Sequence, residues 1–94
     1  MTKVILKVTN ADYYDTVSIF IDGVPYGKKQ GNSTFEIPVA GGEHSIHGIY
    51  DNKEPDFEGY SHTLGPIAFS ANNDIVNFEV KINNIYSGGK LVKK

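Results

Sequence analysis

Apolar side chains recur at every second position in several short stretches of this chain, and this period of two strongly limits what the chain can fold into. Successive side chains of a β-strand point to opposite faces, so each such stretch has one apolar face to bury. The pattern predicts strands over residues 4–9, 17–22, 34–39, 44–50 and 76–82, and extended chain over 60–71 with a bend at Gly65-Pro66. The alternating positions predicted to form the core are Val17, Ile19, Ile21, Phe35, Ile37, Val39, Val76, Phe78, Val80 and Ile82.

Turn-forming residues separate these stretches. Asp22-Gly23 predicts a type I′ hairpin, in which both central residues have positive φ. Residues 24–27 then return as a short edge strand, because Pro25 lacks the N–H that a central strand needs. Residues 51–59 are acidic and rich in turn formers, which predicts a surface loop.

No stretch shows the spacing of an amphipathic helix, so the chain is predicted to be all-β. About seven short strands with turns every eight to twelve residues or so predict an antiparallel immunoglobulin-like β-sandwich. Its 94 residues suit one domain, which we assign to residues 1–83. Residues 84–94 contain Ser87-Gly88-Gly89 and three lysines, and this composition predicts a flexible C-terminal tail.

The middle third of the chain resembles the PEGA-type bacterial β-sandwich module. The resemblance rests on a strand that ends in Asp-Gly, a second glycine a few residues later, and a Gly-x-His turn before a later strand. The matching residues are Asp22, Gly23, Gly27, Gly42 and His44. The resemblance implies a non-catalytic module of bacterial envelope or extracellular proteins.

Composition excludes several classes of function. The chain has no cysteine, which excludes disulfides, thiolate nucleophiles and cysteine-ligated zinc. All nine basic residues are lysines and the net charge is -2, so nucleic-acid binding is not expected. The apolar runs are too short to span a bilayer, so membrane insertion is not expected either. No nucleophile motif or phosphate-binding glycine loop is present, and we expect neither enzymatic activity nor a cofactor.

Tyrosines offer one candidate binding site. Tyrosine combines a flat apolar ring with a hydroxyl, which suits recognition of sugars or proteins. Several tyrosines fall in predicted loops or at strand ends. The candidates for an exposed ligand-binding patch are Tyr13, Tyr14, Tyr50 and Tyr60.

Carboxylates offer a second candidate, since calcium is bound by oxygen ligands that often come from two loops. The candidate metal ligands are Asp12, Asp15, Asp51, Asp56 and Glu58. The histidines are weaker candidates, because His44 and His47 are an odd number of residues apart and should point to opposite faces. We expect the His44 imidazole to hydrogen-bond backbone carbonyls of the preceding turn.

These observations favour a non-catalytic binding or structural module that acts through its loops or edge strands in a bacterial envelope, extracellular or virion-associated assembly. The alternative is a small carbohydrate-binding domain, in a calcium-dependent or calcium-independent form. A protein partner or self-association is expected under the first hypothesis, and carbohydrate under the second. The sequence does not determine the compartment. If a signal peptide has been removed, we expect the extracellular space or the cell surface, and otherwise the cytoplasm.

Overall fold

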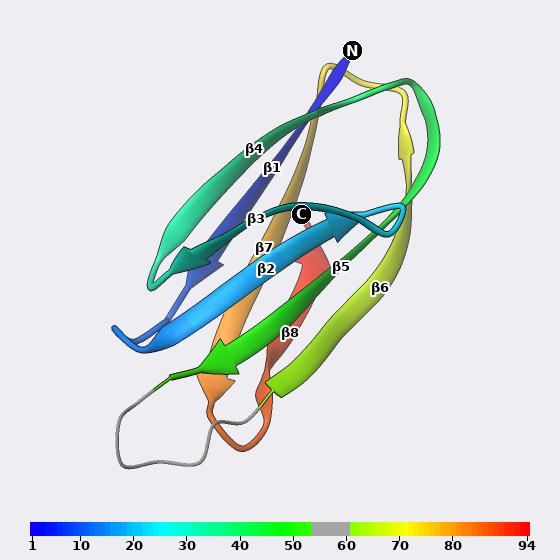
Figure 1. Ribbon diagram of the computed structural model, residues 1–94. Coiled ribbons are helices and arrows are strands. Elements are labelled where there is room, and N and C mark those ends of the chain that lie inside the picture. The colour runs from blue at the N-terminus through cyan, green and yellow to red at the C-terminus, as the bar shows by residue number, and fades with distance from the viewer. Residues whose placement is uncertain (54–60) are drawn as a thin grey trace.

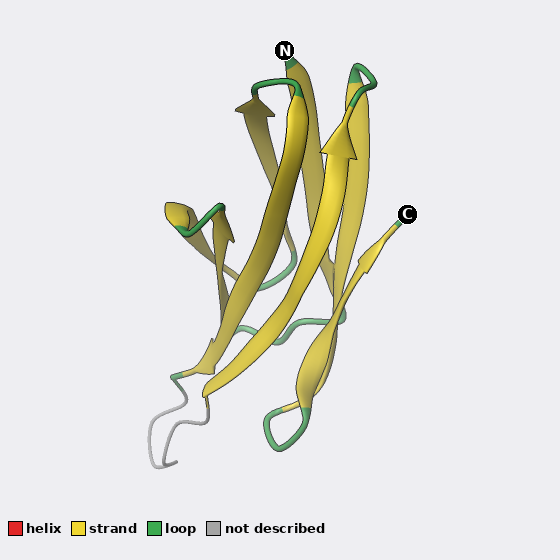
Figure 2. Cartoon of the chain, turned by 90° about the vertical axis from the view of Figure 1, so that its right-hand side faces the viewer, coloured by secondary structure: helices red, strands yellow, loops and turns green. Residues whose placement is uncertain are grey.

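The chain forms eight strands in two packed sheets, so the predicted β-sandwich is confirmed. The computed structural model describes residues 1–53 and 61–94, which contain no helix (Figure 2). The strands are β1 (Thr2–Thr9), β2 (Asp15–Ile21), β3 (Val24–Gln30), β4 (Ser33–Val39), β5 (Gly42–Asn52), β6 (Ser61–Ala71), β7 (Ile75–Asn84) and β8 (Gly88–Lys93).

One sheet has the order β4-β1-β7-β8 and the other β3-β2-β5-β6. All neighbouring strands are antiparallel except β1 and β7, which lie side by side and run parallel although they come from opposite ends of the chain (Figure 1). The predicted antiparallel arrangement holds at every other neighbouring pair of strands in the two sheets. The strand order is also distinctive, because β1 and β2 lie in different sheets, whereas the first two strands of an immunoglobulin constant domain share one sheet.

The core lies between the sheets and contains every residue that the alternation placed there. All ten predicted positions are at most 5% exposed. The rings of Phe69 and Phe78 pack edge to face with their centroids 5.1 Å apart, which joins β6 of one sheet to β7 of the other. Period-two patterning therefore determined the inward faces of β2, β4 and β7.

The β2–β3 hairpin has the predicted geometry. Asp22 and Gly23 have φ values of 53° and 78°, which a type I′ turn requires at both positions. β3 is an edge strand, as Pro25 predicts, but it extends to Gln30. At the predicted bend, Gly65 and Pro66 lie where the pairing of β5 with β6 shifts register between Ile46 and Gly48.

The predicted flexible tail over residues 84–94 is wrong, because residues 88–93 form β8 and pair with β7. Leu91 is buried opposite Val80, and this one apolar anchor attaches the strand to the core. The glycines that predicted flexibility instead permit close packing. A Cβ at Gly89 would lie 2.5 Å from the Lys81 carbonyl oxygen, and one at Gly88 would lie 2.9 Å from the His62 ring.

Candidate functional site

The loop between β1 and β2 presents two aromatic rings at one end of the sandwich. Tyr13 is 74% exposed and Tyr14 is 36% exposed, as the sequence predicts for both. The two rings meet edge to face with their centroids 5.1 Å apart. We call this pair the tyrosine loop site. It offers apolar ring surface and hydroxyl groups together, which is the chemistry of a recognition surface.

Three neighbouring segments hold the backbone of this loop in place. The Gln30 side-chain amide donates to the Tyr13 carbonyl. The Lys53 N–H donates to the Tyr14 carbonyl over 3.1 Å, and the Ala11 N–H donates to the Asn32 side chain over 2.8 Å. The rings are thus exposed on a backbone that is already ordered, which reduces the entropy lost when a partner binds.

A buried polar cluster lies at the end of the same loop. Asp15 is 3% exposed, and one oxygen of its carboxylate accepts hydrogen bonds from the Tyr50 hydroxyl over 2.5 Å and from the Asn52 side chain over 2.9 Å. Its other oxygen accepts from the Asp12 N–H over 2.8 Å, which closes the turn that carries both tyrosines. Burial, followed by the hydrogen bond with Asp15, raises the pKa of Tyr50, so the phenol stays protonated and donates.

The prediction that Tyr50 lies in an exposed patch is wrong. Tyr50 is fully buried, because it shares the inward face of β5 with Ile46 and Gly48. The alternation of residues 44–50 was visible in the sequence. Sequence spacing could not identify Asp15 as the buried acceptor for the Tyr50 hydroxyl, because Asp15 lies on another strand. Tyr60, the remaining candidate, lies outside the described residues.

Of the predicted metal ligands that the structure describes, Asp12 and Asp15 share one turn, but Asp51 does not join them. Asp15 points inward from β2 and is occupied by the buried cluster, whereas Asp51 points outward from β5 and lies 3.9 Å from the Lys28 ammonium. The two carboxylates therefore lie on opposite faces of one sheet, and Asp12 contributes its backbone to the turn. Asp56 and Glu58 lie outside the described residues. Within residues 1–53 and 61–94, no group of three or more potential ligands could hold a metal ion.

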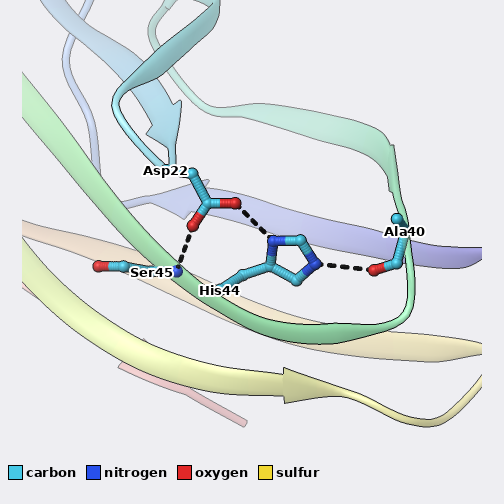
Figure 3. A network of polar contacts seen from close by, with 4 residues as sticks. All are labelled: Asp22, Ala40, His44 and Ser45. Carbon is cyan, nitrogen blue, oxygen red and sulfur yellow. Dashed lines mark hydrogen bonds and ion pairs between the residues drawn. The ribbon is translucent and has the colours of Figure 1, made fainter.

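At the β2–β3 turn, Asp22 and His44 form a polar clasp that ties this turn to the β4–β5 turn (Figure 3). The His44 Nδ1 lies 2.5 Å from the Asp22 carboxylate, and its Nε2 lies 2.7 Å from the Ala40 carbonyl oxygen. The second Asp22 oxygen accepts from the Ser45 N–H over 2.9 Å. The predicted bond from His44 to a turn carbonyl is confirmed. Its carboxylate partner was missed, although Asp22 belongs to the same Asp-Gly turn that predicted the hairpin.

Both ring nitrogens of His44 face acceptors, so the clasp is complete when the imidazole carries two protons. The hydrogen bond to Asp22, followed by that to Ala40, raises the pKa of His44 above its ordinary value of 6.5. The hydrogen bond from His44, followed by that from Ser45, lowers the pKa of Asp22 below 3.8. His47 lies on the opposite face of β5, as predicted, where its ring stacks on Phe20 with centroids 4.6 Å apart.

The clasp predicts a specific dependence of stability on pH. A raised histidine pKa stabilises the fold fully below pH 6.5, and this stabilisation is lost as pH rises through the pKa of folded His44. A lowered aspartate pKa stabilises the fold fully above pH 3.8, and this stabilisation is lost as pH falls through the pKa of folded Asp22. In urea unfolding between about pH 5 and pH 9, the stability difference between wild type and His44→Gln should therefore shrink as pH rises.

The matched control is His47→Gln, which leaves the clasp intact and should keep the wild-type pH profile. A stability difference between wild type and His44→Gln that stays constant from acidic to alkaline pH would contradict the clasp as a charged pair.

Comparison of the chain with protein-family models, with curated proteins and with solved structures gave no match. In the part of the chain that the structure describes, no helix is long and apolar enough to cross a membrane. The tyrosine loop site and the polar clasp therefore have to be interpreted from their own geometry.

Proposed function

We propose that this chain is a non-catalytic binding module that recognises a protein partner through the tyrosine loop site. The observation that carries the proposal is the pair of exposed rings on a backbone anchored by three segments and by the buried Asp15 cluster. Exposed tyrosines on ordered loops provide large contact area at low entropic loss, which is how recognition loops obtain affinity.

Two of the four sheet edges, β3 and β4, carry residues that oppose strand pairing, which favours the loops as the binding surface over these two edges. An open edge strand can recruit another chain through its unpaired backbone groups. Here the β3 edge carries Pro25, Lys28 and Lys29, and the β4 edge carries Glu36 and Pro38. Proline and charged side chains at an edge oppose strand addition. Self-association through these edges is therefore the less favoured route.

The chemistry of the polar clasp also supports a binding role over a catalytic one. A general base needs a ring nitrogen that can accept a proton from a substrate. Both nitrogens of His44 are occupied, one by Asp22 and the other by Ala40. The clasp joins two turns, which is a structural task. Asp22 and His44 are also residues on which the resemblance to PEGA-type modules rests, and this supports a place in a bacterial envelope, extracellular or virion-associated assembly.

The test compares two double variants, each of which replaces two exposed apolar or aromatic side chains by serine. Tyr13→Ser with Tyr14→Ser alters the loop site, and Val24→Ser with Tyr26→Ser alters the β3 edge. Immobilised wild type and both variants are incubated with fractions of the source cells, and a captured protein is identified, purified and titrated against each.

We expect the purified partner to bind the β3 variant as it binds wild type and to lose at least tenfold in affinity for the loop variant, on the order of the loss of one interface hot spot. Equal affinity for the loop variant would reject the loop site. Selective loss with the β3 variant would assign binding to the edge strand.

A carbohydrate ligand is the second candidate for the same site, because tyrosine rings also stack on sugars. A glycan array probed with wild type and with the loop variant, each with and without calcium, distinguishes the two. Signals that require Tyr13 and Tyr14 would replace the protein partner with a glycan, and a silent array would leave the protein partner as the proposal.

A further inference from the structure

The outer face of the β4-β1-β7-β8 sheet gathers positive charge, although the chain as a whole has a net charge of -2. Outward positions alternate with buried ones along β1 and β7. Lys90 on β8 lies opposite the outward Lys81, and Lys94 lies beside the outward Glu79. Five of the nine lysines point outward on this face, against two acidic residues, Glu36 and Glu79. We call it the lysine face, defined by Lys3, Lys7, Lys81, Lys90 and Lys94.

Only part of this charge is neutralised within the fold. Lys3 lies 3.5 Å from the Glu36 carboxylate, and Lys94 lies 3.1 Å from that of Glu79. The second Glu79 oxygen accepts from the Thr9 hydroxyl over 2.9 Å, so this carboxylate is fully occupied. The ion pair with Lys94, followed by the Thr9 hydrogen bond, lowers the pKa of Glu79 and keeps it charged. Among the described residues, the other three lysines of the face have no carboxylate within ion-pair distance.

Two of these three lysines face each other. Lys81 on β7 lies directly opposite Lys90 on β8 in the antiparallel register. Like charges at directly opposed positions destabilise a sheet. An anion bound between the two ammonium groups would remove this repulsion, so the arrangement favours a ligand that carries negative charge.

A shallow hollow of about 340 Å³ lies on the same face. Its size is at the low end of ligand sites, on the scale of a small ring rather than a large cofactor. Its lining combines an apolar residue, Ile5, with the amide residue Asn77 and two lysines, Lys7 and Lys94. Its lining residues are Ile5, Lys7, Asn77, Phe78, Glu79 and Lys94.

We propose that the lysine face binds an acidic polysaccharide, with one sugar unit in the hollow and further anionic groups along Lys7, Lys81 and Lys90. Lysine supplies compact point charges, which suit anionic groups spaced along a flexible polymer. The outward side chains of the four strands include no aromatic ring for base stacking and no arginine for bidentate phosphate contacts, which disfavours nucleic acid. This surface is separate from the tyrosine loop site and does not depend on it.

The probes are polygalacturonate, which carries carboxylates, heparin, which carries sulfates, and dextran as the neutral control. Titrations of labelled protein are followed by two-dimensional NMR and by calorimetry at 50 and 200 mM NaCl. We expect binding of an acidic polymer but not of dextran, shifts at the outward positions of β1, β7 and β8, and weaker binding at the higher salt concentration.

Two triple variants with the same change in net charge locate the site. Lys7→Gln/Lys81→Gln/Lys90→Gln should weaken binding by about tenfold or more, on the scale of removing three direct charge contacts. Lys28→Gln/Lys29→Gln/Lys53→Gln should bind as wild type. Without ligand, the Lys90→Gln variant should unfold at a higher urea concentration than wild type, because it removes the charge repulsion between residue 90 and Lys81.

Equal loss in both triple variants would mean that only net charge matters and would overturn the proposal. Absence of binding at 50 mM NaCl would also overturn it. Polyphosphate, a single-stranded oligonucleotide and poly-glutamate are titrated in parallel, and tighter binding of any of them than of both acidic polysaccharides would replace the polysaccharide with that polymer.

Discussion

Replacing Phe78 by alanine is expected to lower the free energy of unfolding by about 3 to 5 kcal/mol. Phe78 is 2% exposed at the centre of β7 and packs edge to face on Phe69 of the opposite sheet. The substitution removes the transfer free energy of the ring and leaves a cavity between two sheets that cannot collapse without shifting strands. Urea unfolding followed by circular dichroism measures the loss.

Phe20→Ala is the matched control, because Phe20 lies on the outer face of β2 and stacks on His47 instead of filling the core. Its loss of stability should be clearly the smaller of the two. Equal destabilisation by the two substitutions would contradict the position assigned to Phe78.

Replacing Asp15 by alanine is expected to destabilise the fold by at least about 2 kcal/mol, because each buried donor that loses its acceptor costs about 1 to 3 kcal/mol. The Asp15 carboxylate accepts from Tyr50, Asn52 and the Asp12 backbone. The loss should also free the turn that carries the tyrosine loop site. Urea unfolding measures the first effect, and faster amide hydrogen exchange over residues 11–15 measures the second.

Tyr50→Phe is the control for this prediction. It removes one donor and leaves the carboxylate bonded to Asn52 and to the Asp12 N–H, so its effect should be about 0.5 to 1.5 kcal/mol. An Asp15→Ala variant as stable as Tyr50→Phe, with unchanged exchange in the loop, would show that the buried cluster does not hold the turn.

Local sequence signals predicted the strands and the β2–β3 turn because these features depend on neighbours in the chain. The alternation of Val17, Ile19 and Ile21 indicates which face of the strand is buried, even when the strands that pack against it are unknown. Asp22-Gly23 predicts a turn because few residue types tolerate positive φ. The exposed loop tyrosines, Tyr13 and Tyr14, were found in the same way.

The incorrect predictions all concern residues whose environment comes from distant parts of the chain. Residues 88–93 look flexible by composition, but β7 supplies both their hydrogen-bond partners and the Val80 contact for Leu91. For Tyr50, the alternation along β5 indicates the inward direction, but the Asp15 acceptor for its hydroxyl comes from β2. The lysine face was missed because its members come from β1, β7 and β8, which become neighbours only in the sheet.

By itself, the sequence determined that this chain is all-β, which side of the alternating strands is buried, and that the chain supplies no cysteine or arginine side chain. Periodicity and composition depend only on the covalent chain, so these conclusions needed no partner strands. Only the tertiary structure decided that β1 lies parallel to β7, that Asp15 supports the tyrosine loop site, and that Lys81 faces Lys90. Which strands pair within each sheet depends on the packing of the whole core, and therefore on parts of the chain that are distant in sequence.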